Sequence, residues 1–326
     1  MAKVAMLSKW HVHAPGYAKS VIENGSEITC LWDEDPQRGQ KWADELGADF
    51  VPCLDELLAR SDVDAVVVDT PTSMHYEVIM KAARAGKHIF TEKTLAPTVA
   101  QCQEIKEAIE KNQVKFTISF PQRTYPSVQY AKQLLDSGKL GTISLVRLRN
   151  AHSGASANWL PDYWYVEKDA CGGSMMDLGC HPMYISAYLL GKPVRITSMY
   201  NDITGHGVDD NAVNLIEFAN KAIAVVETGF VTPYSPWAFE IYGTNGTLLA
   251  TDQKVRLISA DTRKYTDQHI EVTNLPQELP MPLTSFLNAV DFGTPVDFGI
   301  DDAIDLARLL ENAYIAHDTG RTVEIR

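Results

Sequence analysis

In the first third of the chain, short runs of apolar, often β-branched residues alternate with segments that have the apolar spacing of helices. The apolar runs lie at 4–7, 27–32, 65–69, 88–90 and 115–119. Two of the intervening helical segments, 36–46 and 75–85, each end directly before a glycine, which easily takes the left-handed conformation that closes a helix. Because strands separated by helices join into parallel sheets, this pattern predicts an α/β domain over residues 1–120.

After residue 120 the pattern changes to longer strands in which apolar and polar residues alternate. These strands are expected at 142–150, 194–201, 211–219, 222–230 and 238–243. Alternation of this kind gives each strand one buried and one exposed face, which is typical of an antiparallel sheet. Helices are expected at 282–291 and 301–317. The pattern therefore predicts a second, α+β domain over residues 121–326.

Composition and charge narrow the classes of function. The 326 residues include 29 Lys and Arg against 42 Asp and Glu, a formal net charge of -13, which disfavours binding to nucleic acid or to anionic membrane surfaces. No apolar run approaches the length of a membrane span, and the N-terminus lacks the features of a secretory signal, so we expect a cytoplasmic protein. The five cysteines form an odd set without C-x-x-C, which favours reduced thiols over disulfides or a structural zinc site.

The segment that follows the first strand, SKWHVHAPG at 8–16, lacks the glycines of G-x-G-x-x-G. In that motif glycines allow backbone N–H groups to approach a pyrophosphate at the start of a helix. Pro15 suits the first turn of a helix. His11 and His13 could bind a metal, but no third ligand accompanies them in the sequence, so we expect loop residues and no metal.

The second strand ends in Asp33, about 25 residues after the first turn. An acidic side chain at this place can accept hydrogen bonds from both ribose hydroxyls of NAD, and its charge disfavours the 2′-phosphate of NADP. Arg38 lies close enough in sequence to soften that preference. The alternative is that Asp33 only caps the following segment.

Two later strands also end in polar residues. Asp69, Thr70 and Pro71 follow one strand, at the carboxyl edge where ligands bind to parallel sheets. Lys93 follows the next strand, and its ammonium group there can orient a substrate hydroxyl or a carbonyl product. The alternative is a lysine on the surface.

Asp177 and His181 are four residues apart in a segment that begins with two glycines and continues as a helix. Histidine is the side chain best suited to accept a proton near neutral pH, and a neighbouring carboxylate can orient it. A local hydrogen bond within the helix is the alternative. Aromatic residues just upstream fit either a sugar-binding wall or packing beneath a loop: Trp159, Tyr163, Trp164 and Tyr165.

Taken in order, these segments resemble the Gfo/Idh/MocA oxidoreductase family. The resemblance rests on DAVVVDTPTSMH at 64–75, AARAGKHIFTEK at 82–93 and GGSMMDLGCH at 172–181, together with GTNGTL at 243–248 and GRTV at 320–323. It extends nearly from end to end. The sequence departs from the family pattern in the missing glycines, in Thr94 after E-K and in Tyr184 three residues after the histidine.

The resemblance implies a Rossmann domain that binds NAD, or less readily NADP, and a second domain with a large, mostly antiparallel open sheet for substrate binding and oligomerisation. The resemblance also implies a catalytic set of Lys93, Asp177 and His181, in which His181 accepts the hydroxyl proton. Arg123 and Trp164 join these three as substrate contacts. The cofactor contacts implied are Ser8, Trp10, His11, Val12, Asp33, Arg38, Thr70, Pro71, Thr72, His75, Glu92, Lys93 and Gln122.

The function expected is hydride transfer between a secondary hydroxyl of a sugar, polyol or inositol-like substrate and a nicotinamide cofactor. A redox-neutral epimerase or glycoside-cleaving enzyme with retained NAD is one alternative, and a non-catalytic nucleotide or sugar sensor is another. As partners we expect a small carbohydrate or polyol and further copies of the chain, in a homodimer or homotetramer.

Overall fold

The computed structural model describes residues 1–325 and divides the chain into two compact units. Unit 1 combines Met1–Phe120 with Pro280–Ala307, and unit 2 combines Pro121–Leu279 with the residues from Arg308 onward. Two segments far apart in the sequence therefore build each unit. Among the described residues, no helix has the length and apolarity needed to cross a membrane.

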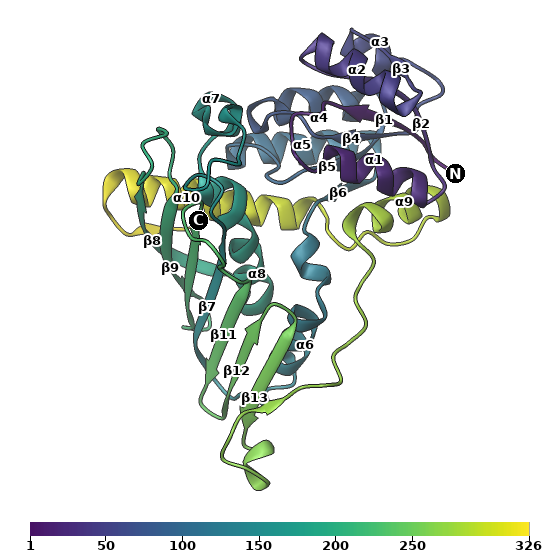
Figure 1. Cartoon of the computed structure of the whole chain (residues 1–326). Coiled ribbons are helices and arrows are strands. Elements are labelled where there is room, and N and C mark those ends of the chain that lie inside the picture. Colours follow the sequence, from purple (N-terminus) through teal and green to yellow (C-terminus); the bar gives the residue numbers. More distant parts are fainter. Residues whose placement is uncertain (326) are drawn as a thin grey trace. The chain divides into compact units, whose positions relative to one another are not determined.

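A six-stranded parallel sheet forms the centre of unit 1, in the order β3-β2-β1-β4-β5-β6 (Figure 1). Its strands are β1 (Lys3–Leu7), β2 (Glu27–Trp32), β3 (Asp49–Phe50), β4 (Ala65–Val68), β5 (His88–Thr91) and β6 (Phe116–Ile118). All four residues of β4 are buried, as expected for a strand covered on both faces. The predicted parallel sheet is confirmed. The strand order reverses at β1 and β4, where sheets of this kind bind ligands beyond the carboxyl ends of their strands.

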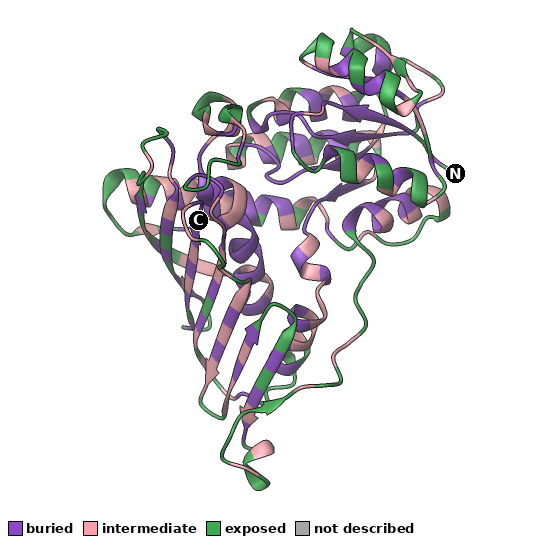
Figure 2. Cartoon of the chain, viewed as in Figure 1, coloured by how far each residue is buried: buried purple, intermediate pink, exposed green. Residues whose placement is uncertain are grey.

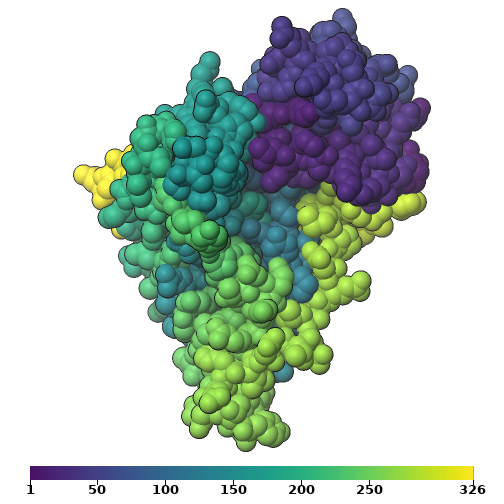
Figure 3. Space-filling model, viewed as in Figure 1, coloured from purple at the N-terminus to yellow at the C-terminus, as the bar shows by residue number. Residues whose placement is uncertain are grey.

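The α-helices of unit 1 are α1 (Ala14–Glu23), α2 (Pro36–Leu46), α3 (Leu54–Leu58), α4 (His75–Arg84), α5 (Val99–Asn112), α9 (Pro282–Phe292) and the first part of α10 (Ile300–Thr319). Helix α2 begins where the Asp35 side chain accepts the N–H groups of Gln37 and Arg38, and it ends where Gly47 takes a φ of 66°. Helix α9 packs against α1, and Figure 3 shows this late segment (yellow-green) directly against the N-terminal residues (purple).

A nine-stranded sheet forms unit 2, in the order β14-β13-β12-β11-β7-β10-β9-β8-β15. Its strands are β7 (Ile143–Ala151), β8 (Pro193–Asn201), β9 (Asn211–Phe218), β10 (Ile223–Gly229), β11 (Ala238–Gly243), β12 (Gly246–Thr251), β13 (Lys254–Ser259), β14 (Ile270–Glu271) and β15 (Val323–Glu324). Neighbouring strands are antiparallel except for β7 and β10. The predicted large, mostly antiparallel sheet is confirmed, although β12 and β13 were not predicted.

One face of this sheet is covered by helices and the other is open. The helices of unit 2 are α6 (Pro126–Asp136), α7 (Glu167–Ala170), α8 (Cys180–Leu190) and the C-terminal part of α10 (Ile300–Thr319). Helix α8 packs against β7 and β10, and α6 packs against α8. Along β9, buried residues alternate with exposed and half-buried ones, and Figure 2 shows this alternation across the sheet.

Candidate active site

The loop between β1 and α1 takes its shape without the usual glycines. Ser8 has a φ of 79°, a left-handed conformation that glycine adopts most easily, and its Oγ accepts the N–H of Trp10 at 3.0 Å. The N–H of His11 donates to the carbonyl of Asp69 at 3.2 Å. Trp10 and His11 are buried, whereas Val12 is 50% exposed. Much of the loop's backbone is therefore held within the protein.

Asp33 is buried at the end of β2 and accepts four hydrogen bonds. Arg38 donates to both oxygens, from Nη2 at 2.6 Å and from Nε at 3.0 Å, and the N–H groups of Lys9 and Asp35 donate at 2.9 and 2.8 Å. These four donors occupy the accepting sites of the carboxylate, and its side chain has no exposed surface, so a ribose would reach Asp33 only after Arg38 moves away. Arg38, which was expected to soften the preference for NAD, is thus in direct contact with Asp33.

Polar groups cluster at the carboxyl end of β4. His75 lies between two backbone carbonyls, with Nδ1 2.6 Å from Thr94 O and Nε2 3.1 Å from Thr70 O. Burial lowers the pKa of His75, and a neutral ring donates to one carbonyl at a time. His75 therefore braces the turn that also contains Pro71 and Thr72. Within residues 1–325, both oxygens of Asp69 and the hydroxyl of Thr70 are buried with no hydrogen-bond partner.

Glu92 and Lys93 directly follow β5, and both are buried. Glu92 Oε2 accepts the N–H of Lys93 at 2.8 Å, while Oε1 accepts from the Tyr17 hydroxyl and lies 2.6 Å from His13 Nδ1. Burial alone would raise the pKa of Glu92, but interactions with His11 and His13 hold it well below its usual range. Lys93 is only 5% exposed, so the surface alternative for this lysine is wrong.

In unit 2, Asp177 and His181 lie four residues apart in consecutive helical segments. Asp177 belongs to a π-helical turn, Met175–Gly179, which leads directly into α8. His181, on the first turn of α8, is 6% exposed, and its Nδ1 lies 2.8 Å from the Tyr184 hydroxyl. That hydroxyl also accepts the N–H of Gln122 at 3.2 Å. Such π-turns are frequent at functional sites because they redirect side chains within a helix.

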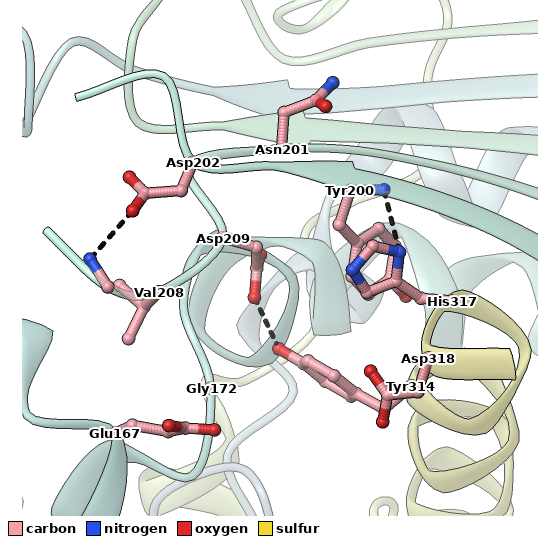
Figure 4. Close-up of a pocket in the computed structure, with 11 residues that line it drawn as sticks. Glu167, Gly172, Tyr200, Asn201, Asp202, Val208, Asp209, Tyr314, His317 and Asp318 are labelled. Atoms are coloured by element: carbon pink, nitrogen blue, oxygen red, sulfur yellow. Dashed lines mark hydrogen bonds between the residues drawn. The ribbon is translucent and has the colours of Figure 1, made fainter. Parts of the chain in front are cut away.

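Asp209, which the sequence analysis missed, holds the segment that leads to Asp177. Its carboxylate accepts from Gly173 N at 3.0 Å, Ser174 Oγ at 3.0 Å, Met175 N at 2.7 Å and the Tyr314 hydroxyl at 2.9 Å. A Cβ on Gly173 would lie 2.0 Å from the Asp209 carbonyl oxygen, so only glycine fits there. Asp209 and Tyr314 also line a pocket of about 270 Å³ (Figure 4). No local sequence pattern joins residues 36 positions apart.

The remaining predicted residues of unit 2 differ in accessibility. The Arg123 guanidinium lies over the Tyr188 ring, 4.4 Å from its centre. Gln122 and Trp164 are buried, whereas Trp159 is exposed beside His152. Tyr165 stacks on His206 at 3.9 Å. The rings of Tyr163 and Trp164 lie against each other with centres 6.0 Å apart, and the burial of Trp164 fits packing beneath a loop.

Two family models match the chain. Residues 6–120 match a model described as an oxidoreductase family with an NAD-binding Rossmann fold, and residues 128–249 match the GFO/IDH/MocA C-terminal domain. The chain belongs to the Gfo/Idh/MocA oxidoreductase family. The resemblance that the sequence motifs indicated is therefore confirmed.

Relatives within the Gfo/Idh/MocA family differ in their named substrates and cofactors. An uncharacterized oxidoreductase of Streptococcus pneumoniae is 29% identical over 231 residues, which is 69% of this chain but only 62% of that relative. The scyllo-inositol 2-dehydrogenase (NAD(+)) of Bacillus subtilis is 28% identical over 304 residues, 89% of this chain and 87% of the relative. The D-xylose 1-dehydrogenase (NADP(+)) 2 of Haloferax volcanii is 26% identical over 308 residues, 92% of each chain.

Solved structures support the same fold for this Gfo/Idh/MocA member. A levoglucosan dehydrogenase, solved in complex with NADH and L-sorbose, superposes with a TM-score of 0.88 at 19% identity, covering 100% of this chain and 99% of that one. At this identity the likeness concerns the fold alone.

Proposed function

We propose that this family member is an NAD(P)-dependent dehydrogenase that acts on a secondary hydroxyl of a sugar, polyol or inositol-like substrate. The observation that carries the proposal is the burial of Lys93 directly after β5, in the unit that matches the NAD-binding model. Lysine is almost never fully buried without a specific role or partner. The dehydrogenase names of the inositol and xylose relatives support the substrate class.

The carboxyl edge of the unit 1 sheet fits a nicotinamide cofactor. The buried Asp69 carboxyl and Thr70 hydroxyl, which lack hydrogen-bond partners in residues 1–325, suit a polar ligand at this edge, and Asp33 suits a ribose. When bound, the nicotinamide supplies the acceptor for hydride. The residues proposed to hold the cofactor are Ser8, Trp10, His11, Val12, Asp33, Arg38, Thr70, Pro71, Thr72, His75, Glu92, Lys93 and Gln122.

Residues of the chain itself are proposed to accept the proton of the substrate hydroxyl. With a proton on Nδ1, His181 donates to the Tyr184 oxygen, and Nε2 is the atom proposed to accept the proton of the substrate hydroxyl. Lys93 orients that hydroxyl and stabilises negative charge on its oxygen. Asp177 orients this pair of catalytic residues, His181 and Lys93. Arg123 and Trp164 complete the proposed substrate contacts.

Absorbance at 340 nm tests this function with NAD or NADP and a panel of sugars, polyols and inositols. We expect net NADH or NADPH formation with at least one secondary alcohol. Substrate conversion without net reduced cofactor would support the redox-neutral alternative instead. Nucleotide binding without conversion of any compound would support the sensor alternative.

Replacing Asp33 with alanine tests the cofactor site. We expect NAD binding to weaken by about 10- to 100-fold, because hydrogen bonds to a charged group contribute about 1.5–3 kcal/mol. NADP binding should weaken less, since the variant also removes the repulsion of a 2′-phosphate and frees Arg38. Isothermal titration of both nucleotides measures the effect, with Arg38→Ala as the matched variant that should lose NADP more than NAD. Equal losses for both nucleotides in D33A would contradict this assignment.

Tyr184→Phe tests the orientation of His181. The variant keeps the ring but removes the oxygen that contacts His181 Nδ1, so we expect kcat to fall about tenfold with KM little changed. The pH at which kcat/KM reaches half its maximum should also shift, because the hydroxyl contributes to the protonation equilibrium of the imidazole. An unchanged pH profile would assign Tyr184 a purely structural role.

We also propose that the open face of the unit 2 sheet forms a contact between copies of the chain. Exposed apolar residues alternate there with buried ones: Met199, Val213, Leu215 and Ile223. Exposed apolar patches of this kind mark association surfaces. We expect a homodimer or homotetramer in light scattering at micromolar concentration, and Leu215→Arg should lower the mass. A monomeric mass for the natural chain would contradict the proposal.

A further inference from the structure

Three potential metal ligands meet at the carboxyl edge of the unit 1 sheet. Each of His11, His13 and Glu92 offers one ligand atom, and these three atoms lie within 4.8 Å of one another. His11 and His13 come from the loop after β1, and Glu92 follows β5, so the fold supplies a third ligand that the sequence spacing does not reveal. The dehydrogenase proposal does not explain why two imidazoles converge on one carboxylate.

The distances are close to those of a coordinated ion. Ligands about 2.0–2.2 Å from a tetrahedral metal are separated by about 3.3–3.6 Å. His11 Nδ1 lies 3.6 Å from Glu92 Oε1, which matches the separation between two ligands of a tetrahedral metal. His13 Nδ1 lies 2.6 Å from the same oxygen, and its side chain is 49% exposed, so it has the freedom to withdraw by the ångström required.

The surrounding groups orient the ligands. The Tyr17 hydroxyl donates to Glu92 Oε1 and contacts Ser119 Oγ at 2.7 Å, while the N–H of Lys93 fixes Oε2. The N–H of His13 donates to the lone pair of His11 Nδ1 at 3.2 Å, so a metal at this nitrogen would replace that N–H. The hydrogen bonds that Tyr17 and Lys93 make to Glu92 are outer contacts typical of metal sites.

The local charge also favours a cation. Glu92 and Asp69 are both buried carboxyl groups. A divalent ion beside Glu92 would offset the cost of burying its carboxylate.

We propose that His11, His13 and Glu92 form a binding site for one divalent transition-metal ion of the zinc type. Two imidazoles and one carboxylate suit such ions better than Mg²⁺ or Ca²⁺, which prefer oxygen ligands. Since His13 is half-exposed, the remaining coordination position is open to water or to an oxygen of a bound ligand. This site goes beyond the proposed dehydrogenase function and does not depend on it.

Metal titration of the full chain, stripped with a chelator and free of nucleotide, tests the site. We expect one Zn²⁺ per chain by calorimetry, and Co²⁺ should give the visible absorption of a tetrahedral ion. His13→Ala should weaken Zn²⁺ binding more than about 100-fold, beyond the usual effect of losing an outer-shell partner. Glu92→Gln should weaken Zn²⁺ binding as well. Because Glu92 is buried, its substitution can also disturb the fold, so the half-exposed His13 is the decisive position.

Two control variants exclude binding elsewhere. His269→Ala and Cys53→Ser each remove an exposed potential ligand outside the cluster, and both should bind Zn²⁺ as the natural chain does. The absence of stoichiometric Zn²⁺, or equal affinity in His13→Ala, would overturn the proposal. Nucleotide binding measured in the presence of chelator reports on the dehydrogenase function separately, so failure of one proposal is distinguishable from failure of the other.

Discussion

Replacement of Lys93 with methionine is expected to lower kcat by about 100-fold or more. Methionine keeps most of the volume and the apolar stem of the side chain but removes the ammonium group. Lys93 is 5% exposed and directly follows β5, so its charge acts within the protein rather than in solvent. A group that positions the reacting hydroxyl and stabilises charge on its oxygen typically contributes a factor of about 10²–10⁴.

Steady-state kinetics on the alcohol identified by the 340 nm assay measure this effect. Lys19→Met is the matched control, because Lys19 is 75% exposed in its side chain and contacts only Glu23 among the described ion pairs. The control should retain the natural kcat. A K93M enzyme within threefold of the natural kcat would exclude the assigned role.

Gly173→Ala is expected to destabilise unit 2 by about 3 kcal/mol or more and to reduce activity with it. The new Cβ would lie 2.0 Å from the carbonyl oxygen of Asp209 and 2.7 Å from its nitrogen, and both are backbone atoms that cannot move alone. Overpacking of a fixed site costs about 1–3 kcal/mol. Here the clash also displaces the Asp209 carboxylate from the N–H groups that begin the turn carrying Asp177.

Thermal unfolding and kcat together measure the result. Gly299→Ala is the control, since a Cβ there meets no atom within 4 Å, and it should unfold near the natural temperature. Loss of kcat without a lower unfolding temperature would place the effect of Gly173 in the site alone. An unchanged unfolding temperature and an unchanged kcat would contradict the packing argument.

Local signals in the sequence were sufficient for much of the fold. Helix α2 has the predicted bounds because Asp35, Pro36 and Gly47 mark its ends chemically. Strands β2 and β11 also have their predicted bounds. By contrast, β12, β13 and α6 were not predicted, although α6 is as long as α2 and β13 alternates buried with exposed or half-buried residues.

Contacts between residues far apart in the chain could not be predicted from the sequence. The return of α9 to unit 1 depends on its packing against α1, about 260 residues earlier, which the hydrogen bond from Asn24 to Thr284 also reflects. Glu92 reaches His13 across 79 residues, and Asp209 reaches Gly173 across 36. The motifs placed Lys93 and His181 correctly on their elements, but the groups that orient them became visible only in three dimensions.

Nucleotide binding tests the central claim most directly, because the loop at 8–16 lacks the glycines that usually hold a pyrophosphate. Isothermal titration of the natural chain with NAD, NADH, NADP and NADPH separates the possibilities. We predict binding of one nucleotide per chain, with NAD and NADH preferred. Failure of all four nucleotides to bind would contradict the assignment of this chain as a nicotinamide-dependent dehydrogenase.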